Sequence, residues 1–488
     1  MKYIYNIFLL IGIMACLNSC DDTVDIIQPG ELGEDNAITN VDDLQAALND
    51  AYFGLNTDQA IQISSLFTDE TSLGFENGGQ NVLLYQFQFN TTSVIASNLW
   101  ITNYFVINGV NRALLAAESI DVDDDEEARF NDILAQLRAI RAAEYFELLT
   151  YFSTDISDDD ALGVMKLDFV PLIDVALPRV SNSEIFEFIN TDLDFAKQFL
   201  DDSRTDPIFI TDGFITAFEA RMALYRGNNS LAISKAQELI DDYPLASPTE
   251  YRNVFRDVSS AGLIFKGERN QSNGSGQIAA NFYFRNVGIN GGAFMELSRS
   301  LFNLLDTDDA RYNTLVQSQS IIDPDYLSNN GKDDILLIGK YPGSFGQPMQ
   351  NDYKYFGVSE MYLIKAEAQA NENDVTGAAI TLKQLRDQRF DNPTDLDVYN
   401  NNVEALQAVQ NERRIELAFE GHRYIDLKRL SPITGLSIDR DPADCGILNA
   451  CTLNSNDFYK FTFPIPAQEL AGNSTIRSQQ NPGYTNDN

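Results

Sequence analysis

The distribution of apolar and polar residues predicts a mostly helical chain. From residue 41 onward, most long segments repeat apolar residues every three or four positions, which is the period of a helix, rather than every second position. Within residues 212–244 one apolar stripe runs to Tyr225, Gly227 interrupts it, and a second stripe runs to Pro244. Alanines on both stripes allow two antiparallel helices to approach closely. We therefore predict a helical hairpin in this segment.

The same pattern recurs elsewhere in the chain. Residues 360–370 and 375–389 are separated by a short polar turn, residues 131–152 are expected to pair with residues 183–200, and a last helix is expected over residues 403–420. Successive hairpins with small residues at facing positions are typical of the tetratricopeptide (TPR) repeat. Because long irregular segments separate these hairpins, we predict a TPR-like scaffold with large insertions rather than a regular solenoid.

The insertions differ from the scaffold in composition. Residues 257–292 are rich in Gly, Asn and Ser, and residues 318–354 contain several glycines together with aromatic residues. Aromatic and polar loops on a rigid helical frame are a common place for a binding site. We therefore expect the ligand to bind on the inserted side, at about residues 257–358.

The best composition for ligand binding within the insertions is NFYFRN, residues 281–286. Aromatic faces and hydrogen-bonding side chains are both needed for a sugar site. In the alternative, Phe282 and Phe284 fill the core and only the tyrosine between them is exposed. The candidate ligand residues are Tyr283, Arg285, Asn286 and Tyr341.

The amino terminus resembles the leader of a secreted protein. Its apolar run, residues 7–17, is shorter than the roughly 20 residues needed to span a bilayer. The sequence LNSC, ending at Cys20, resembles a bacterial lipobox, in which cleavage before the cysteine leaves a thiol for lipid attachment. We therefore expect a leader over residues 1–19, a lipid anchor on Cys20 and a flexible acidic tether over residues 20–40. The acidic residues after the cysteine resemble the surface-export signal of Bacteroidota lipoproteins.

The charge balance excludes some classes of partner. The chain has 34 Lys and Arg against 72 Asp and Glu, a net charge of −38. Such a surface repels nucleic acid and anionic lipid head groups, so we expect neither as a partner, and it favours neutral or cationic ligands. The simplest alternative to an acidic binding site is an acidic surface that only contacts solvent.

The motifs of common enzymes and metal sites are absent from the sequence. His422 is the only histidine, which excludes a zinc site with several histidines. Residues 121–130 begin like a calcium loop but lack its glycine and its final glutamate. No GxSxG elbow and no GxxxxGK[ST] loop occurs. We predict no catalytic residue, no metal and no cofactor.

Two cysteines remain once Cys16 is removed with the leader and Cys20 is lipidated. An oxidising compartment favours pairing of Cys445 with Cys451. So short a loop contributes only about 2 kcal/mol by the chain-entropy relation. The sequence leaves the pairing itself open.

The stretch NERRIELAFEGHRYIDLKRL, residues 411–430, resembles the C-terminal signature of the SusD/RagB family, roughly ERR-x-E-[LF]-x-F-E-G-x-R-x-x-D-L-x-R. FPIPAQEL (residues 463–470) and QQNPGY (residues 479–484) are similar to the closing motifs of that family. Residues 99–115 and 135–152 resemble two of its early helices. These motifs occur in the same order as in the family and extend over the whole mature chain.

The resemblance implies a fold of four TPR-like helix pairs with a variable face, in a single domain over residues 41–488. It implies a non-catalytic surface lipoprotein that captures an oligomeric nutrient for a SusC-like TonB-dependent outer-membrane transporter. The ligand is expected to be an oligosaccharide, with an oligopeptide as the alternative. A lipid-anchored glycoside hydrolase is the main competing class, because a carboxylate pair cannot be excluded from sequence. The family motif places Trp100 in the core, so sugar stacking would rest on Tyr or Phe.

The charged stretch is then expected to be scaffold rather than a binding surface. Glu412 and Glu416 lie on one predicted helix, and Arg138 and Arg141 present their side chains on one face of another. We predict that these glutamates meet these arginines, and that Arg413 belongs to the same ion-pair network. Partly buried pairs fix geometry more than they stabilise, and losing one partner costs about 3–5 kcal/mol.

Overall fold

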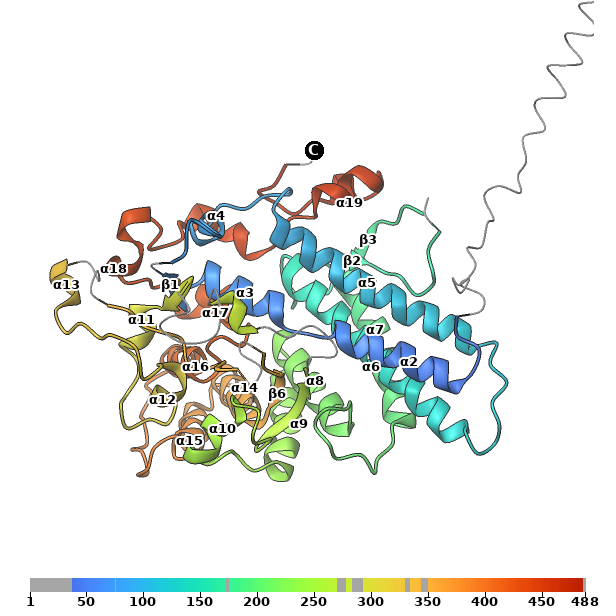
Figure 1. Cartoon of the computed structure of the whole chain (residues 1–488), viewed down its shortest axis with the longest axis horizontal. Coiled ribbons are helices and arrows are strands. Elements are labelled where there is room, and N and C mark those ends of the chain that lie inside the picture. The colour runs from blue at the N-terminus through green and yellow to red at the C-terminus, as the bar shows by residue number, and fades with distance from the viewer. Residues whose placement is uncertain are drawn as a thin grey trace, which may run out of the picture.

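The protein is mostly helical (Figure 1). The strands in the described part of the chain form two-stranded antiparallel sheets. The computed structural model describes residues 37–74, 76–172, 175–269, 278–282, 293–329, 334–343 and 350–485.

The predicted leader (residues 1–19), the lipid anchor Cys20 and nearly all of the tether (residues 20–40) lie outside the described residues. The first described element starts at the end of that tether, where the side chain of Asn40 accepts the backbone N–H of Asp43 and caps the helix that follows. Among the described residues, no helix combines the length and the hydrophobicity needed to cross a bilayer.

Four long helices pack together on one side of the molecule (Figure 1). Helix α6 contacts α2, α5 and α7. The predicted pairing of the segments around residues 131–152 and 183–200 is confirmed, because they form α6 and α7. The bounds are α2 (Val41–Gly54), α5 (Val94–Ala117), α6 (Glu127–Phe152) and α7 (Asn182–Phe199).

The other predicted hairpins are also confirmed. Helix α8 packs against α9, α9 packs against α14, and α14 packs against α15 and α16, so the hairpins stack side by side. Gly227, with φ of +75°, makes the turn between the first two. The bounds are α8 (Asp212–Tyr225), α9 (Asn229–Asp242), α14 (Val358–Asn371), α15 (Val375–Arg386) and α16 (Asn402–Glu416).

The predicted last helix over residues 403–420 is too long. Helix α16 ends at Glu416, and a new helix, α17 (Arg423–Thr434), starts after a sharp turn. Phe419 and Gly421 adopt left-handed backbone conformations there, with φ of +62° and +91°. A β-carbon on Gly421 would lie 2.8 Å from a side-chain carbon on α3 (Asp58–Phe67), so the tight turn also brings the chain against α3. The apolar period continues through this turn, which explains the error.

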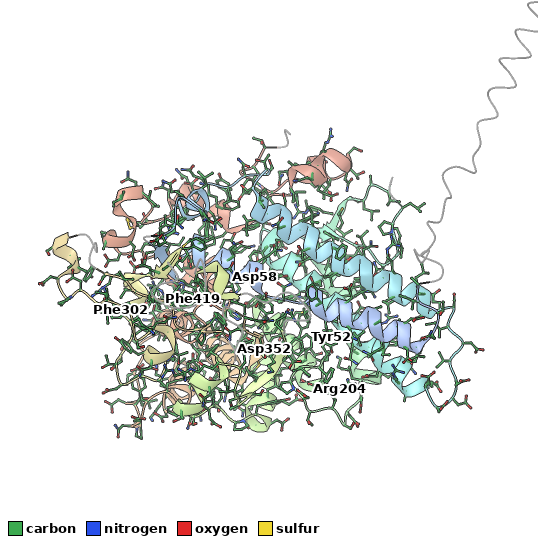
Figure 2. All side chains as sticks on the ribbon, in the orientation of Figure 1. Tyr52, Asp58, Arg204, Phe302, Asp352 and Phe419 are labelled. Atoms are coloured by element: carbon green, nitrogen blue, oxygen red, sulfur yellow. A yellow bond between two sulfur atoms is a disulfide. The ribbon has the colours of Figure 1, made fainter. Side chains whose placement is uncertain are left out.

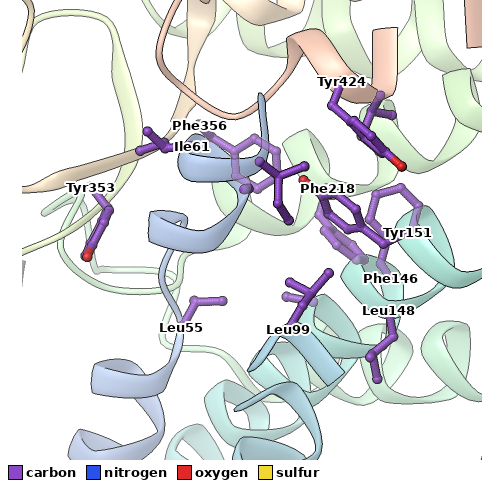
Figure 3. Close-up of a cluster of buried hydrophobic side chains, with 14 of the residues drawn as sticks. Leu55, Ile61, Leu99, Phe146, Leu148, Tyr151, Phe218, Tyr353, Phe356 and Tyr424 are labelled. Atoms are coloured by element: carbon purple, nitrogen blue, oxygen red, sulfur yellow. The ribbon is translucent and has the colours of Figure 1, made fainter. Parts of the chain in front are cut away.

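Buried side chains join elements from both ends of the chain (Figure 3). Ile61 on α3, Phe146 on α6, Phe218 on α8 and Tyr424 on α17 belong to one apolar cluster. Trp100 lies in the same cluster with only 2% of its surface exposed, and its indole N–H donates to Glu469 at 3.1 Å. Its position agrees with the core role expected from the sequence.

The insertions add short strands and helices on the other side of the molecule (yellow in Figure 1). Strand β4 (Leu263–Gly267) pairs with β6 (Tyr353–Gly357), and β5 (Met295–Leu297) pairs with β1 (Thr71–Leu73). Asp352, labelled in Figure 2, accepts a hydrogen bond from Lys266 on β4 at 2.8 Å beside this sheet. The β4–β6 pair joins the two ends of the inserted region, and contacts of β4 with α8 and of β6 with α14 attach it to the helical scaffold.

A disulfide joins Cys445 to Cys451, a pairing that the sequence favours but leaves open. The α-carbons lie 5.0 Å apart, within the range usual for this bond. The bond closes a short loop after α17 and therefore acts as a local staple.

Candidate ligand-binding site

The charged stretch of α16 is buried, as a scaffold role requires. The side chains of Glu412 and Glu416 are 4% and 1% exposed. Glu412 contacts Arg311 and Arg386, each at 2.6 Å. Glu416 contacts Arg389 at 2.7 Å and Arg311 at 3.3 Å. These glutamates therefore have no face available to a ligand.

The predicted partners of the two glutamates were wrong. Arg138 and Arg141 lie on α6 and bind Asp192 of α7, at 3.2 Å and 2.7 Å. Helix α7 packs along α6, whereas α16 packs against α14, α15 and α17, so the arginines of α6 face the carboxylate of their own neighbour. Arg413 binds Asp426 at 2.8 Å, one helix further along the chain.

The buried network stabilises the ionised form of its carboxylates. Burial alone would raise the pKa of Glu416, but Arg389 and then Arg311 outweigh it and lower this pKa to about 2. The pKa of Glu412 is also lowered, because Arg311 and Arg386 outweigh the effect of burial. Carboxylates held in this way are structural charges and not acids or bases poised near neutral pH.

Tyr341 is the one predicted ligand residue in the described part of the chain, since Tyr283, Arg285 and Asn286 lie outside it. Tyr341 is only 2% exposed, and its hydroxyl donates to the carbonyl of Phe419 at 3.0 Å. Its ring has no face open to a ligand, so the structure gives it a core role instead.

A large pocket lies on the scaffold side but is mainly apolar. It has a volume of about 680 Å³ and is formed by residues of α5, α6 and α7 and of the loop around Phe169. Its two arginines are bound to Asp192, and its Asn111 is held by Arg141 and by the carbonyls of Leu167 and Phe169. Its remaining polar lining side chains are the carboxylates of Glu118 and Asp168, and Lys166 lies 3.6 Å from Asp168.

A second, polar pocket lies on the inserted side, where the ligand was expected. It has a volume of about 190 Å³ and opens between α10 (Pro248–Val254), α12 (Tyr312–Leu315) and residues 339–342. The two short helices lie side by side in Figure 1. We call this the insertion pocket; its lining residues are Arg252, Phe255, Arg256, Asn313, Thr314, Val316, Gln317, Ser318, Gln319, Gly339, Lys340 and Pro342.

The insertion pocket has an ordered floor. Helix α10 starts at Ser247, which forms a reciprocal capping box with Glu250 and sets the direction of the helix. Phe255 is 5% exposed, and the Lys340 ammonium lies 4.4 Å from its ring centre. Lys340 is fully buried and donates to the carbonyls of Glu416 and Ala418 and to a carboxylate. The floor therefore rests directly on the end of α16.

Amide and hydroxyl groups line the mouth of the pocket. Asn313 is exposed and Gln317 is half-buried, and neither side chain makes a hydrogen bond within the described structure. Ser318 and Gln319 lie beside them. Gly339 passes so close to this wall that a β-carbon would lie 2.7 Å from the carbonyl oxygen of Thr314. Free amides next to a fixed backbone are suited to binding sugar hydroxyls.

The chemistry of the insertion pocket is that of binding. Its lining residues include no Asp, Glu, His or Cys, so it holds no acid–base pair and no nucleophilic thiol. Within the described residues, no group of three or more His, Cys, Asp and Glu side chains is placed to hold a metal ion. The pocket has no local signal in the sequence, because α10 and α12 are distant in the chain and carry no motif.

Comparison with known proteins agrees with the fold. Residues 342–484 match the model of the SusD family. The chain is 25% identical to the "SusD-like protein P2" of Formosa agariphila, over 98% of both chains. A SusD superfamily protein of Bacteroides thetaiotaomicron has a TM-score of 0.74 at 23% identity, covering 91% of this chain and 100% of that one. A "SusD-like carbohydrate binding protein" of Bacteroides vulgatus has a TM-score of 0.73 at 19% identity, covering 90% and 98%.

The family model covers the charged stretch and both closing motifs of the sequence, while the structural likeness covers about nine-tenths of the chain. Over nearly its whole length the chain is therefore similar to SusD-like proteins, and its C-terminal part matches the SusD family model.

Proposed function

We propose that this protein is a non-catalytic lipoprotein of the cell surface that captures an oligosaccharide and delivers it to a SusC-like TonB-dependent outer-membrane transporter. Similarity to the SusD/RagB family supports a nutrient-binding role. The observation that carries the proposal is the insertion pocket, which offers amides and hydroxyls without a catalytic group on the side of the scaffold that carries the variable loops.

A glycan suits the pocket better than the alternatives. Sugars need many hydrogen bonds, and the free side chains of Asn313 and Gln317 supply donors and acceptors. One similar structure is that of a protein described as carbohydrate binding. An oligopeptide is the second candidate ligand within the family. A glycoside hydrolase would need two carboxyl groups about 5–9.5 Å apart at its site, and the insertion pocket has none.

Cell-surface attachment through Cys20 follows from the lipobox and completes the proposal. A tether of about twenty residues has a mean span of roughly 25 Å if flexible, which lets the body move over the mouth of a transporter while anchored. Replacing Cys20 with Ala should move the protein from the membrane fraction to the soluble fraction. Retention of the Cys20→Ala protein in the membrane would contradict the anchor.

The binding proposal is tested by screening the purified protein on a glycan array beside a library of oligopeptides. We expect binding to at least one oligosaccharide and no release of reducing ends from it. Asn313→Ala should weaken that binding, whereas Asn49→Ala, an exposed asparagine on α2, should not. Binding of peptides alone, or release of reducing ends, would reject the proposal. Co-purification with a TonB-dependent transporter in mild detergent tests the partner.

A further inference from the structure

We infer that the insertion pocket is an anion subsite, and that Arg252 and Arg256 bind a sulfate or carboxylate group of an acidic oligosaccharide. This inference rests on the proposed function and specifies its substrate class. The two arginines lie at the end of α10 and just beyond it, and both line the pocket.

The two guanidinium groups have no partner in the protein. Within the described residues, the side chains of Arg252 and Arg256 make neither a hydrogen bond nor an ion pair. Most other arginines of the described chain bind carboxylates or backbone carbonyls, as Arg221 binds Glu360 at 2.7 Å and Arg440 binds the carbonyl of Thr68 at 2.7 Å. The pair at the pocket is therefore available to a ligand.

The nearest carboxylates in the sequence are committed elsewhere. Glu250 accepts from the hydroxyl of Ser247 at 2.8 Å and from its backbone N–H, in the cap of α10. Asp257 binds Lys354 and accepts from the amide of Asn351 at 2.7 Å. Arg252 and Arg256 are therefore close to Glu250 and Asp257 in the sequence, but neither carboxylate forms an ion pair with them in the structure.

The pocket also contrasts with the rest of this acidic chain. Its lining contains two arginines without a carboxylate partner and no Asp or Glu, although the chain carries 72 Asp and Glu against 34 Lys and Arg; the third cation of the lining, Lys340, is buried and paired with Glu420. Three other pockets in the described part of the chain each contain Asp or Glu. A patch without carboxylates is unexpected by composition and is the arrangement that an anionic group requires.

The two arginines repel each other weakly without a ligand, since Arg252 is exposed and Arg256 is half-buried. Like charges four residues apart repel each other on a helical segment. Burial and the charge of Arg256 both lower the pKa of Arg252. A cation in the last turn of a helix is favoured by the helix dipole, which accounts for Arg252 but not for Arg256 beyond the helix end. A bound anion would remove the repulsion, and guanidinium groups bind sulfate and carboxylate with two parallel hydrogen bonds.

An acidic glycan fits the pocket better than an acidic peptide. Beside the arginines stand Asn313, Gln317, Ser318 and Gln319, which are suited to hydroxyl groups. The apolar lining residues Phe255 and Val316 are buried, so the mouth offers little apolar surface for the side chains of a peptide. The net charge of −38 would repel an anion at long range, but charges beyond about 8 Å are largely screened at physiological salt.

The test measures binding of the mature protein by calorimetry to four probes of equal length. The probes are a sulfated galactan hexasaccharide, an oligogalacturonate hexasaccharide, a neutral galactan hexasaccharide and a hexaglutamate peptide. The variants are Arg252→Gln, Arg256→Gln and the double variant. Arg129→Gln removes an exposed arginine on α6 that pairs with Asp42 at 2.7 Å, and serves as the matched control.

We expect one of the acidic hexasaccharides to bind more tightly than the neutral one, with an affinity that falls as sodium chloride rises. The double variant should bind the acidic hexasaccharide at least tenfold more weakly while its melting temperature stays unchanged. Arg129→Gln should bind it with unchanged affinity. Partial recovery in Arg256→Lys would show that the positive charge itself is used.

Two results overturn the inference while the proposed function stands. In the first, the neutral hexasaccharide binds as tightly as the acidic ones. In the second, an acidic hexasaccharide binds but the double variant keeps its affinity. Preference for hexaglutamate would replace the glycan with an acidic peptide. Absence of binding to these probes, together with no binding on the glycan array, would reject the proposed function as well.

Discussion

Replacing Glu416 with Gln should destabilise the protein strongly although it changes the side-chain volume little. Glu416 is 1% exposed and contacts Arg389 at 2.7 Å. Arg389 is 2% exposed, and its other hydrogen bonds go to the carbonyls of Ala246 and Gln388. A glutamine at residue 416 would leave the charge of Arg389 buried without a carboxylate from the described residues.

The magnitude follows from two independent quantities. Removing one partner of a buried ion pair costs about 3–5 kcal/mol. The pKa of Glu416 is lowered from 4.5 to about 2, and a lowering of this size corresponds to roughly 3 kcal/mol of preference for the ionised form. We therefore expect Glu416→Gln to reduce the free energy of unfolding by about 3–5 kcal/mol.

The effect should also depend on pH. Because the pKa of Glu416 is lower in the folded state than in the unfolded chain, its stabilisation is complete above pH 4.5 and is lost as the pH falls towards about 2. The difference between the natural protein and Glu416→Gln should be constant from pH 5 to 8 and shrink below pH 4.5. Urea unfolding followed by tryptophan fluorescence and circular dichroism measures it.

Two further variants make the experiment decisive. Glu238→Gln removes an exposed glutamate of α9, whose side chain is 56% exposed and 4.0 Å from Lys235, and should change the free energy of unfolding by less than about 0.5 kcal/mol. Arg389→Met combined with Glu416→Gln removes both charges and should be more stable than Glu416→Gln alone. A loss below about 1 kcal/mol in Glu416→Gln would refute this account of the network.

Three other changes test particular parts of the fold. Burial raises the pKa of Glu70 from 4.5 to about 7, so the free energy of unfolding should fall as the pH rises from 4.5 to 7 and this buried carboxyl ionises. In Glu70→Gln that fall should be smaller by roughly 1–3 kcal/mol, as measured by urea unfolding at several pH values. Gly421→Ala should lower the melting temperature, because its φ of +91° and its contact with α3 both resist a side chain; an unchanged melting curve would contradict this. Cys445→Ser with Cys451→Ser should cost only about 2 kcal/mol in urea unfolding and leave glycan binding unchanged, whereas loss of binding would give the loop a functional role.

Sequence periodicity predicted the helical hairpins because each depends on contacts between neighbouring segments. The stripe that ends at Tyr225, the turn at Gly227 and the stripe that follows contain the information for α8 and α9. The end of α16 was predicted wrongly because the apolar period continues through Phe419. There the chain turns because the backbone N–H of Phe419 donates to Glu70, a residue 349 positions away. Such a distant partner is not visible in a local pattern.

The partners of the charged residues could not be predicted for the same reason. Burial of Glu412 followed from the family motif, but its partner Arg311 lies 101 residues away on an inserted segment. A buried glutamate can form an ion pair with an arginine from any part of the sequence, so sequence spacing does not indicate which arginine is its partner. Only the packing of α16 against its neighbours decides the pairing.

Arginines without a carboxylate partner are unusual in the charged stretch of this protein. In the charged stretch each arginine finds a carboxylate: Arg413 contacts Asp426 at 2.8 Å, Arg423 contacts Asp69 at 2.8 Å and Arg429 contacts Glu367 at 2.5 Å. In a chain with twice as many acidic as basic residues, a cation that stays without a carboxylate lies where the fold keeps carboxylates away. Arg252 and Arg256 are in that position together, at a pocket with polar walls. Selection for folding alone does not require two such cations side by side, because a carboxylate or a neutral residue at either position would relieve their repulsion.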